Sequence, residues 1–114
     1  MALGFDLLCA EVVLSLKKRF PDIRLICVLP YRAQSEMWNV TQKARHGLIL
    51  DQADEIIVLS EEYFHGCFLR RNDYMLKRCG TVVAYYDGKL QGGTYYTFKK
   101  ARENRLRLIN LYSS

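Results

Sequence analysis

The sequence predicts an α/β fold: a mostly parallel four-stranded sheet with helices on both faces. Helical and strand-like segments alternate along the chain, and the strand-like segments are too apolar to face water on either side. The chain has 114 residues, of which 50% are hydrophobic and 25% are charged. This composition is typical of a globular protein, and we expect residues 1–114 to form a single domain.

The first elements are a helix, a buried strand and a second helix. Residues 6–20 carry apolar side chains at helical spacing and end before Pro21, which predicts an amphipathic helix. Residues 23–29 form an apolar run with Arg24 as its only charge, closed by Pro30, as is typical of a buried parallel strand. Residues 35–50 are polar at first and apolar later, which predicts the second helix.

Strands and helices continue to alternate in the second half of the chain. The segments 56–59, 81–86 and 106–111 are short, apolar and rich in strand-forming residues, so each predicts a strand. Residues 66–79 and 94–104 have helical composition, and Gly80 fits the position just past a helix end. The expected order is therefore a helix, then strand and helix in alternation, with a strand last.

Composition also disfavours several classes of protein. The apolar runs are far shorter than the ~20 residues of a bilayer-spanning helix, and Asp6 and Glu11 interrupt the apolar start as no signal peptide would. We therefore expect a cytoplasmic protein with no membrane partner. The four cysteines include no C-x-x-C pair, so we expect buried free thiols, and neither a metal nor a cofactor.

The charge is unevenly distributed. Seventeen Lys and Arg residues against twelve acids give a net charge of +5, and the cations cluster at 17–19, 70–71, 77–78 and 99–107. Such clusters favour anionic partners, such as nucleotides, nucleic acid or an acidic protein face. A solvated helix face has the same pattern, so both interpretations stay open for each cluster.

The stretch YYDGKLQGGTYYTFKKA, residues 85–101, is the first candidate ligand site. Ligands of open α/β sheets bind outside the carboxyl ends of the strands, where Asp87, Gly92, Gly93 and Thr94 are expected to lie. Glycines let the backbone approach a ligand, and a helix opening at Thr94 would point free N–H groups at a phosphate. The alternative is a flexible turn in which Thr94 is only a helix cap.

Two further groups of residues are candidates for ligand binding. Arg70, Arg71 and Asn72 combine a phosphate-clamping guanidinium with an amide, although an exposed basic helix turn is the alternative. Asp6, shortly after Gly4 at a helix start, either caps that helix or accepts a hydrogen bond from a ribose hydroxyl.

The sequence shows no catalytic residue. No Ser, Cys or carboxylate comes with an evident base partner. Trp38, with Tyr31 and Gln34, follows Pro30 and either stacks on a base or packs beneath its loop.

Four stretches together resemble the SLOG superfamily, in its branch of small bacterial YpsA-like proteins. They are MALGFDLLCAEVVLSLK, LPYRAQSEMW, ADEIIVLSEEYFHGCFLRRNDYM and VVAYYDGKLQGGTYYTFKKA. The resemblance runs over nearly the whole chain, with several motifs in the right order. It implies a Rossmann-like fold and a nucleotide-derived ligand, and related LOG-type members cleave nucleotide-sugar bonds.

The resemblance also implies roles for individual residues. Gly4 and Asp6 fall on the superfamily's first ligand-side loop and helix start. Arg71 and Asn72 match its Arg-Asn pair. Gly92, Gly93 and Thr94 match its Gly-Gly-Thr phosphate loop, which favours the phosphate site over the simple turn.

The chain departs from the superfamily pattern in two places. The LOG-type hydrolases carry a Glu shortly after Gly-Thr, whereas residues 95–98 contain none, which argues against nucleotide-sugar hydrolysis. A non-enzyme is therefore favoured, and a nucleotide hydrolase is the third, less favoured possibility. Members of this branch usually begin with a strand, a helix and a strand, whereas here Met1 stands at the Ala-Leu-Gly-Phe-Asp motif. We therefore expect an N-terminally truncated fold, an exposed apolar face on the first helix, a rearranged four-stranded sheet and a homodimer.

Two functions follow from these observations. The first is a non-catalytic SLOG-type domain that binds a nucleotide-derived or phosphate-bearing ligand through the Gly-Gly-Thr loop. The alternative is a small basic interaction protein, such as a phage or mobile-element inhibitor of a host defence nucleoprotein, similar in role to an anti-CRISPR protein.

Overall fold

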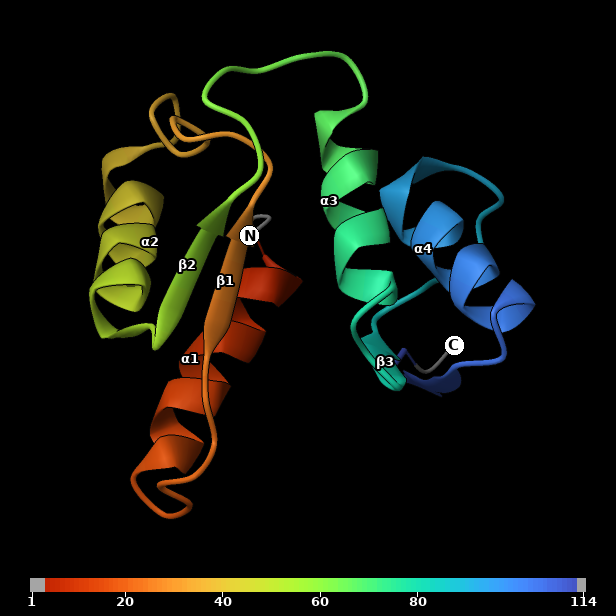
Figure 1. The fold of residues 1–114 in the computed structure, drawn as a ribbon, viewed down its shortest axis with the longest axis horizontal. Helices are drawn as coiled ribbons and strands as arrows, with labels where there is room; N and C mark the ends of the chain where they lie inside the picture. The colour runs from red at the N-terminus through yellow and green to blue at the C-terminus, as the bar shows by residue number, and fades with distance from the viewer. Residues whose placement is uncertain (1–3, 113–114) are drawn as a thin grey trace. The chain divides into compact units, whose positions relative to one another are not determined.

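The computed structural model describes residues 4–112 (Figure 1). Helices and strands alternate from an N-terminal helix to a C-terminal strand, which confirms the predicted order of elements. The chain comprises two compact units, Met1–His65 and Gly66–Ser114. Each unit contains two helices and two strands, and the expectation of a single domain stays a prediction.

The first unit contains α1, Phe5–Lys17, β1, Ile26–Leu29, α2, Val40–Gln52, and β2, Glu55–Val58. The strands β1 and β2 pair in parallel, with Ile26 opposite Glu55 and Leu29 opposite Val58. Helix α2 connects them, as is usual for parallel neighbours, which need a long crossover connection.

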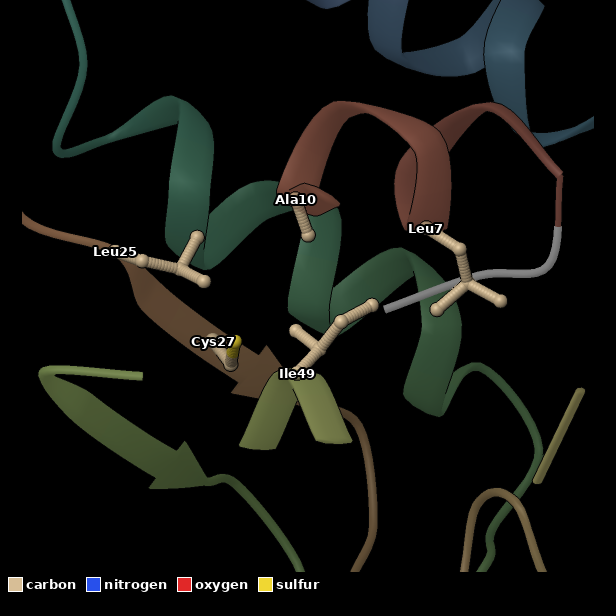
Figure 2. Close-up of a cluster of buried hydrophobic side chains, with 5 residues drawn as sticks. All are labelled: Leu7, Ala10, Leu25, Cys27 and Ile49. Carbon is tan, nitrogen blue, oxygen red and sulfur yellow. The ribbon is translucent and has the colours of Figure 1, made fainter. Parts of the chain in front are cut away.

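The core of the first unit lies between α1, α2 and the start of β1 (Figure 2). Its buried residues are Leu7, Ala10, Leu25, Cys27 and Ile49. Trp38 packs against this cluster and makes an edge-to-face contact with His46, at 5.0 Å between ring centroids. The structure therefore favours packing beneath the loop, rather than stacking on a base, as the role of Trp38.

The second unit contains α3, Cys67–Leu76, β3, Thr81–Ala84, α4, Gly92–Glu103, and β4, Arg107–Asn110. The strands β3 and β4 pair in parallel, with Thr81 opposite Arg107 and Ala84 opposite Asn110. Helix α3 packs against α4, and α4 contacts both strands. Cys67 is fully buried, and all four cysteines are free thiols.

The structure confirms the α/β class but not the expected four-stranded sheet. The strands form two separate two-stranded parallel pairs, β1 with β2 and β3 with β4. Each pair is one strand-helix-strand unit whose strands are consecutive in the chain. Consecutive strands pair readily because a short right-handed crossover brings them together, whereas a four-stranded sheet needs pairing between units.

Several element ends differ from the sequence prediction. Strand β3 ends at Ala84 rather than Tyr86, because the Tyr86 N–H donates to Asn110 Oδ1 at 3.0 Å instead of to a backbone carbonyl. Helix α3 ends at Leu76 and is capped by Lys77, so Gly80 does not directly follow the helix as predicted. Gly80 leads into β3 instead.

No helix in residues 4–112 is both long and apolar enough to cross a membrane.

Candidate functional site

A pocket of about 550 Å³ opens at the carboxyl end of β3, beside the N-terminus of α4. We call it the Gly-Gly-Thr pocket. It is lined by Tyr85, Tyr86, Asp87, Lys89, Gln91, Gly92, Gly93, Thr94 and Tyr112. Four of the residues predicted to bind a ligand, Asp87 and the Gly-Gly-Thr triplet, are therefore brought together at the expected end of a strand.

The first wall of the pocket is a turn built on Asp87. Its Oδ1 accepts a hydrogen bond from the Lys89 N–H at 3.0 Å, and Gly88 between them has a φ of 89°. The Tyr86 hydroxyl donates to the Lys89 carbonyl at 2.7 Å. Asp87 thus holds the turn, while the Lys89 ammonium, 3.8 Å from Asp87 Oδ2, offsets the charge of the carboxylate.

The second wall is the first turn of α4, which begins two residues earlier than predicted. Gln91 is the N-cap residue and Gly92 is the first helical residue, so Thr94 neither opens nor caps the helix. Gly92 has a φ of 91°, where a residue with a Cβ is strained. The chain turns into the helix at Gly92 because glycine alone tolerates this conformation easily.

The early start changes which groups face the pocket. The first N–H groups of any helix lack an intrahelical acceptor, and no side chain caps those of α4. The first helical residues are Gly92, Gly93 and Thr94 themselves, so the backbone donors lie within the motif. Donors of this kind, with the positive end of the helix dipole, suit an anion.

Arg71 and Asn72 lie on α3, behind the first turn of α4. A Cβ added to Gly93 would lie 3.9 Å from Asn72 Nδ2, which is ordinary contact distance. The Arg71 Nε–H donates to Asn72 Oδ1 at 3.0 Å, and the guanidinium carbon is 5.7 Å from the Phe68 ring centroid. Neither Arg71 nor Asn72 lines the pocket, and a ligand role for them stays a prediction.

The sequence left open that Arg70 and Arg71 belong to an exposed basic helix turn. The structure supports this interpretation for Arg70 but not for Arg71. Arg71 is only 5% exposed, whereas Arg70 is exposed. Burial of a guanidinium is costly unless it is hydrogen-bonded. The pairing with Asn72 explains why these two residue types are adjacent, and sequence alone does not reveal which arginine is buried.

Gly4 and Asp6 belong to the first unit, whereas the pocket lies in the second. Gly4 is the N-cap of α1 with a φ of 76°, and Asp6 lies in the first turn of the helix. The prediction that Asp6 caps α1 is therefore wrong: the left-handed conformation at the cap is occupied by glycine, and no side chain caps the helix. A ligand role for Gly4 and Asp6 stays a prediction.

The aromatic lining of the pocket is missing from the sequence-based list of site residues. Tyr85 and Tyr112 meet edge to face with 5.1 Å between ring centroids. Tyr86 packs on Phe98 with 4.8 Å between ring centroids, and burial raises the pKa of the Tyr86 hydroxyl. The signal for two of them was the pair Tyr85-Tyr86 directly before Asp87, whereas nothing in the sequence pointed to Tyr112.

Asp87 is the one acidic residue among those that line the pocket. The first turn of α4 holds no acidic residue, and Glu103 ends the helix, at ~16 Å along its axis from Gly92. Among residues 4–112 no group of three His, Cys, Asp or Glu side chains is placed to hold a metal ion.

Comparisons with known proteins relate the chain to one family. The sequence model of the YspA SLOG family matches residues 1–111. The SPbeta prophage-derived protein YoqJ of Bacillus subtilis is 33% identical over 103 residues, covering 80% of this chain and 60% of YoqJ. A UPF0398 protein of Staphylococcus epidermidis is 30% identical over 96 residues, covering 82% of this chain and 51% of that protein.

A UPF0398 protein of Bacillus cereus is 26% identical over 103 residues, covering 89% of this chain and 56% of that protein. The chain therefore spans little more than half the length of these relatives. The family match covers both units, including the Arg71-Asn72 pair and the Gly-Gly-Thr motif. This chain belongs to the YspA SLOG family.

Proposed function

We propose that the chain binds a nucleotide-derived or other phosphate-bearing ligand in the Gly-Gly-Thr pocket, without catalysing its conversion. One observation carries the proposal. Asn72 and Gly93 are far apart in the sequence, yet the Asn72 amide lies in contact range of the Gly93 Cβ position. Two separate stretches of the superfamily pattern thus meet at the helix N-terminus that lines the pocket.

The phosphate would be held by backbone donors and by a few side chains. The uncapped first turn of α4 supplies N–H groups and a positive dipole end. Thr94 adds a hydroxyl and Lys89 a positive charge at the rim. Because Gly92 carries no Cβ, a phosphate can approach the backbone closely.

The absence of an acid in the first turn of α4 supports binding without hydrolysis. General acid or base catalysis needs a titratable group within hydrogen-bond reach of the reacting atom. Asp87 is the acid that lines the pocket, and its Oδ1 already accepts the Lys89 N–H. Asp87 therefore stabilises the turn between β3 and α4.

Two substitutions at Gly93 test the proposal. Gly93→Glu places a carboxylate among the anion donors, whereas Gly93→Ala adds a Cβ at an ordinary 3.9 Å from Asn72 Nδ2 and serves as the matched control. We would titrate each protein calorimetrically with inorganic phosphate, AMP, ADP, ADP-ribose and NAD, and follow thermal unfolding in parallel.

We expect at least one phosphate compound to bind the wild type and Gly93→Ala, and Gly93→Glu to lose about tenfold or more in affinity. A ligand at ~100 times its dissociation constant should stabilise the fold by about 2.7 kcal/mol. Equal binding by all three proteins would place the ligand elsewhere. If no compound binds the wild type, the Gly-Gly-Thr motif is a structural turn and not a phosphate site.

A second candidate function is the binding of a nucleoprotein or an acidic protein, as an inhibitor of a host defence system would. The relative YoqJ is prophage-derived. Lys99, Lys100, Arg102, Arg105 and Arg107 belong to none of the ion pairs among residues 4–112. These cations are available for an anionic surface.

The salt dependence of binding to double-stranded DNA tests this second function. A protein that neutralises several phosphates loses affinity steeply as salt rises. We expect the variant Lys99→Glu/Arg102→Glu to bind more weakly and with a shallower slope than the wild type. No measurable binding to DNA at low salt would leave acidic proteins as the partner class for this function.

A further inference from the structure

The Gly-Gly-Thr pocket contains a pair of aromatic rings that phosphate binding does not need. Tyr85 follows β3 and Tyr112 follows β4, and both line the pocket. Their rings meet edge to face, with 5.1 Å between centroids and 80° between planes. This contact covers a single ring face, and the two residues are 54% and 36% exposed. We call the pair the tyrosine platform.

The side chain of Asn110 fixes the backbone on both sides of the tyrosine platform. Its Oδ1 accepts hydrogen bonds from the Tyr86 N–H at 3.0 Å and from the Tyr112 N–H at 3.1 Å. Its Nδ2 donates to the Tyr86 carbonyl at 3.0 Å. One amide thus continues the link between β3 and β4 beyond the backbone bond from the Leu111 N–H to the Ala84 carbonyl. The platform is therefore held in place before a ligand binds.

The lining of the pocket combines two kinds of chemistry. Flat aromatic faces bind flat aromatic groups by stacking, and every nucleobase has such a face. The first turn of α4 and Lys89 offer donors and positive charge for an anion. The volume of about 550 Å³ falls within the range of small-molecule sites, about 300–1,000 Å³. A ligand with a base and a phosphate would use both parts of the pocket, whereas a sugar phosphate would leave the rings unused.

We propose that the ligand is a nucleoside phosphate whose base stacks on the tyrosine platform while its phosphate lies at the first turn of α4. The inference rests on the proposed phosphate site and names the class of ligand that this site selects. Tyr85 and Tyr112 bind the base, and Asn110 is a positioning residue that acts through them. Because all bases have flat faces, the platform favours nucleotides over base-free phosphates and discriminates little among bases.

Calorimetric titration of the wild type with AMP, GMP and ribose 5-phosphate tests the inference. Ribose 5-phosphate carries the sugar and the phosphate without the base. We expect the tighter of the two nucleotides to bind about tenfold or more tightly than ribose 5-phosphate. Equal affinity for all three would overturn the platform and leave the phosphate site intact. If neither nucleotide binds, the inference fails, and the panel of phosphate compounds described above decides separately on the phosphate site.

A pair of double variants tests the rings themselves. Tyr85→Leu/Tyr112→Leu removes both rings and keeps apolar side chains, so the affinity for the nucleotide should fall to about that for ribose 5-phosphate. Tyr85→Phe/Tyr112→Phe keeps the rings and should retain the preference for the nucleotide. Tyr63→Leu makes the same change at an exposed tyrosine of the first unit and serves as the control. A Leu/Leu variant that retains the preference would place the base elsewhere.

Asn110→Ala tests the positioning role. The Asn110 amide holds the backbone of Tyr86 and Tyr112, so its loss should narrow the preference for the nucleotide more than it weakens ribose 5-phosphate. Equal loss of both affinities would show that Asn110 supports the whole pocket, and would overturn its role at the platform. Thermal unfolding checks that every variant folds.

Discussion

At the scale of single residues, the backbone conformation at one glycine shapes the candidate site. Gly92 and Gly93 are adjacent and chemically identical, yet Gly92 has a φ of 91° while Gly93 has no such left-handed backbone. The first glycine is needed for the turn into α4. A Cβ added at the second would lie 3.9 Å from Asn72 Nδ2, which is an ordinary contact distance.

This difference predicts opposite effects of alanine at the two positions. Gly92→Ala should lower the free energy of unfolding by about 1–3 kcal/mol, because a Cβ is strained at that φ. Gly93→Ala should be neutral or stabilise by up to about 1 kcal/mol, because alanine favours helix and meets ordinary contacts. Urea denaturation of both variants measures the two effects. Equal effects would contradict the different backbone conformations assigned to Gly92 and Gly93.

His46 is a second residue whose environment has a measurable consequence. It is 3% exposed, and its Nε2 has no hydrogen-bond partner among the described residues. Burial lowers the pKa of the imidazole from its usual 6.5. The folded protein therefore resists protonation at His46 more than the unfolded chain does.

We expect stability to fall as the pH drops below about 6.5, because the unfolded chain then takes up a proton that the folded protein refuses. The loss attributable to His46 is at most about 1.4 kcal/mol per pH unit. Urea denaturation between neutral pH and the carboxylate range measures it. His46→Phe should flatten the pH dependence, whereas the same substitution at the exposed His65 should not.

At the scale of elements, the contact between α3 and α4 positions the Gly-Gly-Thr pocket. The Tyr96 hydroxyl of α4 donates to the Asp73 carboxylate of α3, at 3.0 Å from Oδ1. This bond ties the two helices together close to the point where Asn72 meets Gly93. The placement of the glycine loop thus depends on helix packing as well as on its own sequence.

Removing the Tyr96 hydroxyl should loosen this helix pair. Tyr96→Phe is expected to lower the free energy of unfolding by about 1–2 kcal/mol, because a partly buried hydrogen bond to a charged group is lost. Tyr95→Phe is the matched control, since no hydrogen bond of the Tyr95 hydroxyl is found in residues 4–112. Chemical denaturation compares them, and equal losses would argue against a tie between the helices.

At the scale of the whole molecule, each unit supplies a different surface. The first unit presents the exposed apolar residues Leu8, Val12 and Leu16 of α1, and the second presents the pocket. The second unit also carries the cations from Lys99 to Arg107, which form none of the ion pairs among residues 4–112. The net charge of +5 suits anionic partners in either proposed function. The chain spans little more than half the length of the relatives it matches.

The sequence by itself determined the type and order of every helix and strand, the α/β class and the family. It could do so because hydrophobic periodicity and turn-forming residues act over a few neighbouring positions. The residues at 92–94 were also identifiable as a candidate site, since glycines followed by a hydroxyl after a strand are a local pattern.

Only the tertiary structure decided how the strands pair, where α4 begins and which arginine is buried. Four strands of similar composition leave their pairing open, and the structure pairs them two by two. Helix α4 begins at Gly92, and Arg71 is buried on α3, which packs against α4. Such contacts join residues distant in the chain, and no local pattern encodes them.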